Sequence, residues 1–278
     1  MKHVSPSLYT RKYYLTHCSG FKEFKKTHGR LLEPRLKHLI ENIKIEKNFK
    51  VLDLGCGRGE LAIWVASEGS EVYGIDYSRE AIKLANIALS KQPQNIKEKV
   101  SFLQMNAKKL SFADNYFDII VSLEVWEHLY PAEQKTSLKE ILRVLKSGGE
   151  VIIHTEPNRI FNQYVYRLWC YPLSSLLIFL NKCLTGKKYP NLPKWSLTAL
   201  NKSRILHVNE PTYYSLKTLF CSINGLVKIE SPNVIWTKPC LSWKDSIYNF
   251  VVFLYPLSCY WPFKITFGQD FLITFKKK

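Results

Sequence analysis

The sequence predicts an α/β fold with a doubly wound, mostly parallel sheet and helices on both faces. Short apolar runs alternate with helical patterns from Lys47 to about Pro157, as expected for parallel strands joined by crossover helices. The first apolar run ends in closely spaced glycines at the start of a helical pattern. The capping residues agree, because Ser78 precedes one helical pattern and Pro131 opens another.

The glycine loop lies in Val51–Glu60, which reads VLDLGCGRGE. Glycines let the backbone turn sharply and approach a ligand, and the helix that follows presents free N–H groups. The dinucleotide fingerprint places its third glycine where this chain has Glu60, so NAD or FAD is the less favoured ligand. The loop therefore predicts a nucleotide-type site with three glycines on alternate positions: Gly55, Gly57 and Gly59.

Four further segments follow in the order expected of such a sheet. The apolar run Glu71–Ile75 ends in Asp76, and a carboxylate at a second-strand end can accept both ribose hydroxyls of an adenosine. Lys99–Met105 and Tyr116–Glu124 are the third and fourth strands. Ile141–Ile153 contains the end of a helix and the fifth strand. Its helix has Leu145 on the apolar face and ends at Gly148.

Together these motifs resemble the class I S-adenosylmethionine (SAM) dependent methyltransferases, including the type 11 group and the ubiquinone-pathway O-methyltransferases. The resemblance implies an enzyme that uses SAM and a seven-stranded sheet whose last strand is antiparallel. Val227–Glu230 and Phe271–Phe275 are the candidates for the last two strands. The cofactor residues that the resemblance implies are Asp53, Gly55, Gly57, Gly59, Asp76, Tyr77, Asn106, Ala107, Leu123 and Glu124.

The catalytic group is predicted near the end of the fourth strand. Methyl transfer requires alignment of the acceptor with the methyl group, and also a base if the acceptor is a hydroxyl. Glu124–His128 reads EVWEH and resembles a segment of many small-molecule methyltransferases. His128 is the first candidate base and His154 the second. Alternatively, Glu127 and His128 only begin a helix and satisfy its free N–H groups.

A metal site is an alternative use of the same segment. Small-RNA 2′-O-methyltransferases use an E-x-x-E-H segment and a later histidine to hold Mg²⁺, and this resemblance implies the set Glu124, Glu127, His128 and His207. Two imidazoles are unusual ligands for magnesium, so we predict no metal site. The absence of any C-x-x-C pair argues against zinc.

Composition leaves the partner open. The 278 residues carry a net charge of +17, but the lysines are scattered along the chain and form no stripe. This charge has three possible explanations: a solvated surface, an anionic membrane or lipid-linked substrate, and RNA, of which nucleic acid is the less favoured. Seven cysteines without paired spacing indicate a reducing compartment, and Met1–Gly20 does not read as a secretory signal. We therefore expect a cytoplasmic protein, with membrane-surface association as an option.

Four regions are predicted. Residues 1–46 form an N-terminal extension with a helix from about Leu31 to Ile43 and with tyrosines, Tyr13 and Tyr14 among them, suited to cover the cofactor. Residues 47–157 form the SAM-binding core. Residues 158–225 form an insertion that binds the acceptor or acts as a lid. Residues 226–278 hold the last strands with an apolar insertion at 240–265, so the C-terminal part forms an insertion subdomain.

Two apolar segments decide what surrounds the acceptor. Leu168–Leu180 and Ile247–Phe263 are both uncharged, and each is shorter than the roughly 18 to 20 apolar residues of a spanning helix. They suit a lid, a homodimer face or an interfacial position on a membrane. Three functions follow: methyl transfer to a hydroxyl of a small or lipid-linked acceptor, such as a glycan sugar or a quinone-like ring; RNA 2′-O-methylation; or a non-catalytic module of the same fold.

Overall fold

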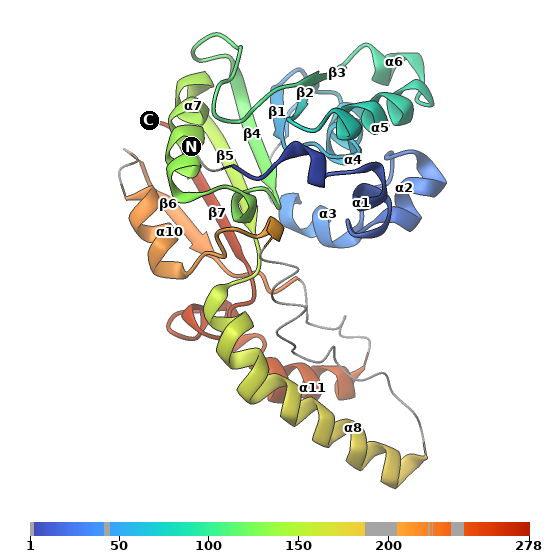
Figure 1. Cartoon of the computed structure of the whole chain (residues 1–278), viewed down its shortest axis with the longest axis vertical. Helices are drawn as coiled ribbons and strands as arrows, with labels where there is room; N and C mark the ends of the chain where they lie inside the picture. Colours follow the sequence, from blue (N-terminus) through green and yellow to red (C-terminus); the bar gives the residue numbers. More distant parts are fainter. Residues whose placement is uncertain (1–2, 42–44, 187–204, 222, 224, 235–241) are drawn as a thin grey trace.

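The computed structural model describes residues 3–41, 45–186, 205–221, 223, 225–234 and 242–278 (Figure 1). Its centre is a seven-stranded sheet in the order β3-β2-β1-β4-β5-β7-β6. All neighbours are parallel except β7, which is antiparallel to β5 and β6. The fold class predicted from the sequence is thus confirmed. The strands are β1 (Lys50–Leu54), β2 (Glu71–Asp76), β3 (Val100–Gln104), β4 (Phe117–Leu123), β5 (Leu145–Thr155), β6 (Val227–Glu230) and β7 (Phe271–Lys276).

Helices cover both faces of the sheet, and a separate apolar core lies on each face. On one face Leu138 and Ile141 of α7 and Leu216 of α10 pack against the strands. On the other, Leu39 of α3 and Ile63 of α4 pack against them. The helices that flank the sheet, with one 3₁₀ turn, are α4 (Glu60–Ser67), α5 (Arg79–Ser90), α6 (Gln94–Lys97), the turn η2 (Trp126–His128), α7 (Pro131–Val144) and α10 (Tyr213–Phe220). Ser78 caps α5 and Pro131 opens α7, as predicted.

The predicted end of α7 is wrong. The helix stops at Val144, and Leu145 already pairs with Phe117 as the first residue of β5. Gly148 therefore lies inside the strand, at a φ of +77° beside the irregular register between β4 and β5. Leu145 is fully buried in this strand, and its apolar character alone did not distinguish a helix face from a strand.

The N-terminal cover, residues 3–41, lies beside the carboxyl ends of β1 and β2. Its elements are η1 (Pro6–Leu8), α1 (Arg11–Thr16), α2 (Phe21–Thr27) and α3 (Pro34–Ile40). The helix expected from about Leu31 begins only at Pro34, because proline disfavours helical backbone in the residue before it. Leu39 and Ile40 are buried, as their spacing predicts, and Ile43 lies outside the described residues.

An arm projects from the core (Figure 1). It begins with a π-helical segment, η3 (Phe161–Cys170), that continues directly into α8 (Tyr171–Thr185). The helix α11 (Trp243–Phe253) packs against η3 and α8, and the 3₁₀ turns η4 (Leu257–Cys259) and η5 (Phe263–Ile265) complete the arm. Residues 187–204, 222 and 224 of the predicted insertion, and 240–241 of the apolar one, lie outside the described residues.

The first apolar segment belongs to a helix that is longer than its apolar run. Phe161–Thr185 is one helix of 25 residues, and within the described part of the chain it is the one helix long and apolar enough to cross a membrane, by length and composition. The sequence indicated only Leu168–Leu180, because Asn162, Gln163 and Arg167 interrupt the apolar run ahead of it.

Candidate active site

A cavity of about 370 Å³ opens at the carboxyl ends of β1, β2 and β4. The strand order reverses between β1 and β4, which is where ligands bind in open α/β sheets. Asp53 and Gly59 stand behind its wall. Eight predicted cofactor residues line it: Gly55, Gly57, Asp76, Tyr77, Asn106, Ala107, Leu123 and Glu124.

The glycine loop leaves no room for side chains at two positions. A Cβ on Gly55 would lie 2.2 Å from Cγ2 of Val125, and one on Gly59 would lie 2.5 Å from Cζ of Phe102. Both glycines also have a φ of +86°, a conformation that L side chains rarely adopt. Gly55 thus brings the backbone to the cavity, and Gly59 lets α4 begin close against β3.

Asp76 is held in place by the loop that it faces. The Gly57 N–H donates to its Oδ2 at 3.1 Å, and the Ser78 N–H donates to its Oδ1 at 2.8 Å. Burial raises its pKa to about 6, so the carboxylate remains ionised at neutral pH. Each oxygen has a further lone pair, so this carboxylate fits a ribose diol at the end of β2.

Asp53 is buried directly behind the glycine loop. Its Oδ2 has no hydrogen-bond partner among the described residues. Burial, with the nearby charges of Glu60 and Asp76, raises its pKa to about 8. Asp53 therefore lies behind the cavity, while the glycine cradle, which has no space for Cβ atoms, lets a nucleotide-like cofactor approach the backbone closely.

The N-terminal cover closes one side of the cavity. Tyr9, Tyr13 and Tyr14 all line it. Arg58 of the glycine loop is buried and donates from Nη1 to the Tyr14 carbonyl at 2.8 Å, and it also bonds the Ser19 carbonyl. The tyrosines that the sequence assigned to a cofactor cover therefore lie where such a cover would act.

His128 faces the cavity from η2, next to the end of β4. Its Nδ1 lies 3.0 Å from the Leu206 carbonyl, which can only accept, so Nδ1 carries the proton and Nε2 keeps a free lone pair. Burial, with the neighbouring His207, lowers the pKa of His128 to about 3. The side chain is thus a neutral imidazole with one acceptor atom.

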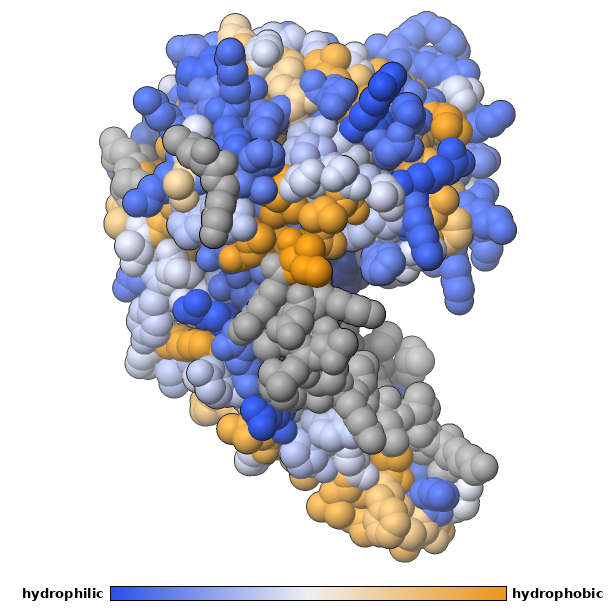
Figure 2. Space-filling view, in the orientation of Figure 1, coloured by the Kyte–Doolittle hydropathy of each residue, from blue (hydrophilic) through white to orange (hydrophobic). Residues whose placement is uncertain are grey.

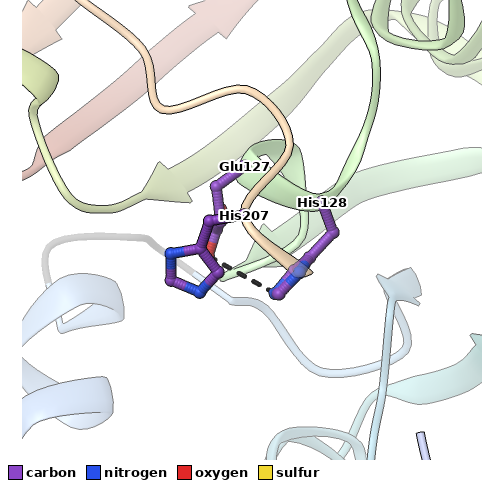
Figure 3. Close-up of side chains that lie close together, drawn as sticks. All are labelled: Glu127, His128 and His207. Carbon is purple, nitrogen blue, oxygen red and sulfur yellow. Dashed lines mark ion pairs between the residues drawn. The ribbon is translucent and has the colours of Figure 1, made fainter. Parts of the chain in front are cut away.

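Glu127 and His207 stand beside His128 (Figure 3). One ligand-type atom of each of the three residues lies within 4.8 Å of the others. Burial raises the pKa of Glu127 well above its usual range, and the Thr155 hydroxyl donates to its Oε2 at 2.9 Å. Glu124, the fourth residue of the alternative magnesium set, is directed to Arg35 instead.

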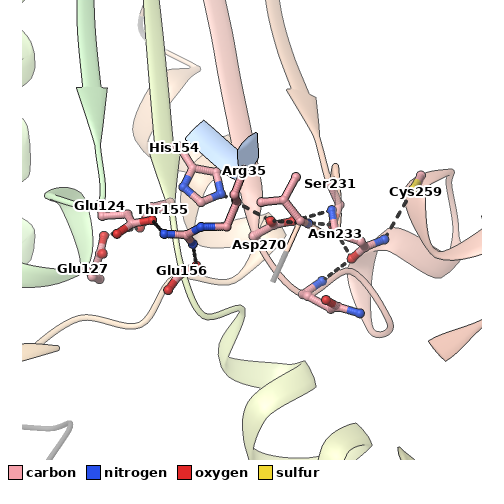
Figure 4. Close-up of polar contacts among 12 residues, drawn as sticks. Arg35, Glu124, Glu127, His154, Thr155, Glu156, Ser231, Asn233, Cys259 and Asp270 are labelled. Atoms are coloured by element: carbon pink, nitrogen blue, oxygen red, sulfur yellow. Dashed lines mark hydrogen bonds and ion pairs between the residues drawn. The ribbon is translucent and has the colours of Figure 1, made fainter. Parts of the chain in front are cut away.

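Arg35 of α3 joins two carboxylates at the cavity wall (Figure 4). It donates from Nη1 to Glu156 at 3.0 Å and from Nη2 to Glu124. Glu124 has a φ of +58°, rare for a residue with a side chain, at the point where β4 opens onto the cavity. The guanidinium compensates two acidic groups that both line the site.

His154, the second candidate base, does not line the cavity. It is fully buried, and its Nε2 lies 3.3 Å from Oδ2 of Asp270 (Figure 4). Burial by itself would lower the pKa of His154, but the hydrogen bond and charge of Asp270 outweigh it and raise the pKa. Asp270 also accepts from the N–H groups of Asn233 and Val234. His154 therefore ties β5 to the start of β7.

Sequence reasoning missed Arg35, Arg58 and Glu156. Arg58 occupies a variable position of the glycine motif, and an arginine inside a loop otherwise built of small residues was the available signal. Arg35 lies 89 residues from Glu124 and 121 from Glu156, so no local pattern links them.

Fold and site define a class: a Rossmann-like α/β protein with a nucleotide-type cofactor site beside a second, acid- and histidine-lined region. Residues 52–153 match the model of a family described as a methyltransferase domain. Residues 52–153 thus form a methyltransferase domain of the class I SAM-dependent type, for which SAM is the cofactor.

Individual relatives agree with this assignment. The chain is 33% identical over 122 residues to the methyltransferase GfsG of Streptomyces halstedii, covering 44% of this chain and 42% of that one. It is 32% identical over 136 residues to a ubiquinone biosynthesis O-methyltransferase of Rickettsia typhi, covering 48% and 52%. The chain thus spans about half the length of the curated relatives it matches.

Solved structures share the fold over most of the chain. A SAM-dependent methyltransferase of Mesorhizobium loti superposes with a TM-score of 0.53 at 14% identity, covering 86% of this chain and 96% of the other. A Haloferax volcanii protein solved in complex with the Trm112 methyltransferase activator superposes with a TM-score of 0.54 at 15% identity, and the match covers 96% of each chain.

Proposed function

We propose that this protein transfers the methyl group of SAM to a hydroxyl of a small or lipid-linked acceptor, such as a glycan sugar or a quinone-like ring. The observation that carries the proposal is the fixed tautomer of His128, whose free Nε2 stands next to the cofactor end of β4. Relatives named as ubiquinone biosynthesis O-methyltransferases support oxygen as the acceptor atom.

The residues of the chain have separate tasks in this reaction. Bound SAM supplies an electrophilic methyl group on a sulfonium. The glycine loop and Asp76 would hold the cofactor, while Arg35 fixes Glu124 at the cavity wall. His128 Nε2 would accept a hydrogen bond from the acceptor hydroxyl and take its proton as the C–O bond forms and the bond between the methyl carbon and the sulfonium sulfur breaks, which leaves the cofactor as a neutral thioether. Because the Leu206 carbonyl holds the proton at Nδ1, the neutral imidazole presents Nε2 as its acceptor atom.

Radiolabel transfer tests the proposal. The full-length protein is incubated with methyl-tritiated SAM and, separately, with a lipid extract, a water-soluble glycan fraction and total RNA. We expect label in the lipid or glycan fraction, and mass spectrometry should find a product heavier by one methyl group. Label confined to RNA would overturn the proposal in favour of nucleic acid. Failure to bind SAM in calorimetry would instead identify a non-catalytic module.

A second candidate is metal-assisted 2′-O-methylation of RNA. It is favoured by the proximity of Glu127, His128 and His207, which could ligate a cation together (Figure 3). The charge of +17 also suits a polyanion. The pairing of Glu124 with Arg35 opposes it, because that carboxylate is then compensated within the protein.

Chelation separates the two candidates. Incubation with EDTA followed by gel filtration should leave label transfer unchanged if His128 acts as a base. Loss of transfer, restored by added Mg²⁺ or Mn²⁺, would support the metal-assisted reaction. Binding to RNA that weakens steeply with salt would support it further.

A further inference from the structure

The arm exposes apolar side chains along one face of its long helix. Leu168, Leu176 and Phe179 are spaced by about one or two turns and are 71%, 52% and 60% exposed. Tyr164, Leu180 and Leu184 continue this stripe and are exposed as well. Figure 2 shows the apolar surface at the end of the arm that lies farthest from the core. We call these six residues the apolar stripe.

The opposite face of the same helix is already occupied. Cys170, Val252 and Phe253 are buried where η3 and α8 meet α11, and the Ser174 hydroxyl lies 2.7 Å from the Tyr248 hydroxyl. The arm is therefore internally packed, and the apolar stripe is not its folding core. A soluble surface rarely exposes so large an apolar patch without a partner.

Aromatic and basic residues accompany the stripe. Tryptophan and tyrosine prefer the boundary between lipid and water. Trp169, Trp243, Tyr260 and Trp261 are all exposed on the arm. In the described residues of the arm, Asp245 is the one acidic side chain, against the basic residues Arg167, Lys182 and Lys244, while Lys264 donates to the Ile229 carbonyl of β6. This charge complements anionic lipid headgroups.

The same charges set the orientation of the helix. The uncharged stretch between Arg167 and Lys182 is roughly 21 Å long at 1.5 Å per residue. A bilayer core is about 30 Å thick. The helix thus fits better along the interface, with its stripe in the acyl boundary and its basic residues at the headgroups.

We propose that the arm is a membrane-binding element that inserts the apolar stripe into the interface of an anionic bilayer. A second copy of this chain is the competing occupant, but it would bring two sets of basic residues together with one acidic residue each. This inference does not rest on the identity of the methyl acceptor, because lipid binding is measured without turnover.

The chain segment 158–225, which contains the arm helix, also links the arm to the active site. After the arm helix, the chain returns to the core, where Leu206 accepts the hydrogen bond of His128 and His207 lines the cavity. An arm held at a membrane would thus keep the acceptor side of the cavity near that surface, which would suit an acceptor anchored in lipid.

Vesicle flotation tests the inference. Full-length protein is mixed with vesicles of phosphatidylcholine alone or with about a third phosphatidylglycerol. We expect flotation with the anionic vesicles and at least tenfold weaker partitioning of the triple variant Leu168→Ser, Leu176→Ser, Phe179→Ser. The matched control replaces Leu31, Ile87 and Leu226, which are exposed outside the arm, by serine and should float like the wild type.

SAM affinity measured by calorimetry shows that each variant is folded. If the wild type remains at the bottom of the gradient with both kinds of vesicle, the inference is wrong. It is also overturned if the triple variant floats as well as the wild type. A lipid-free wild type that sediments as a dimer, a triple variant that sediments as a monomer, and no flotation of either would assign the apolar stripe to a second copy instead.

Discussion

The donor half and the acceptor half of the cavity are built in different ways. The donor half uses Gly55, Gly57 and Asp76 from neighbouring strands, and its key bond joins Gly57 to Asp76, 19 residues apart. The proposed acceptor half combines Glu124, which Arg35 of the N-terminal cover holds, with His128 from η2 and His207 from beyond the arm. A short continuous segment of chain thus determines which cofactor binds, whereas the acceptor is chosen by parts that only the complete fold brings together.

The largest expected effect concerns the acceptor half. The change His128→Asn keeps a donor for the Leu206 carbonyl and removes the free lone pair at Nε2. Turnover should fall about 10² to 10⁴-fold, the usual contribution of a general base, while SAM affinity stays the same. Transfer of radiolabel over time measures turnover, and calorimetry measures SAM affinity. The control is His38→Asn, at an exposed position. Equal loss of turnover and SAM binding would assign His128 a structural role.

The next effect tests whether the buried Asp53 carboxyl behind the glycine loop carries a proton. Asp53 has a pKa of about 8 in the folded protein, above its ordinary value, so the folded state holds more protons than the unfolded one between about pH 4 and 8. The stability of the wild type should therefore fall as pH rises through this window. Asp53→Asn removes this dependence. The free energy of unfolding of the variant, relative to that of the wild type, should therefore rise by about 1.4 kcal/mol for each pH unit of increase within this window. Urea unfolding of both proteins at pH 5, 6.5 and 8 measures it, and parallel curves would disprove the buried proton.

A smaller loss is expected at the ribose position. Asp76→Ala removes a charged acceptor at the end of β2, and SAM should bind more weakly by roughly 1.5 to 3 kcal/mol. Calorimetry at pH 7.5 measures the change, because there the carboxylate is ionised. Asp114→Ala, at an exposed residue that does not line the cavity, is the control. Unchanged affinity would refute the ribose role.

The smallest effect separates two costs of replacing a glycine by alanine: the contact of the new Cβ with its neighbours and the strain of a positive φ angle. Gly55 and Gly148 have similar positive φ angles, of +86° and +77°, but a Cβ on Gly148 would have nothing within 4 Å. Gly55→Ala should therefore lower the free energy of unfolding by about 1 to 3 kcal/mol more than Gly148→Ala. Denaturant titration measures the difference. Equal losses would mean that Val125 moves aside freely.

The sequence predicted the sheet and the donor half because their signals are local. Glycines, strand ends and helix caps act over a few residues, so Asp76 and Ser78 could be placed before the structure was known. It did not indicate the bonds of Arg35 to Glu124 and Glu156, which depend on how α3 packs against the sheet. The arm helix was underestimated because polar residues near its start do not stop a helix, although they interrupt an apolar run.

The bonds of Arg58 have a consequence for the speed of the enzyme. Arg58 belongs to the loop that cradles the donor, yet it holds the backbone of Tyr14 and Ser19 in the cover. If the demethylated cofactor leaves on this side, those bonds must break and the cover must move. Opening of the cover would then compete with chemistry as the slow step, as in other enzymes with closing lids. The arginine that completes the donor site would then also set how fast the site can be used again.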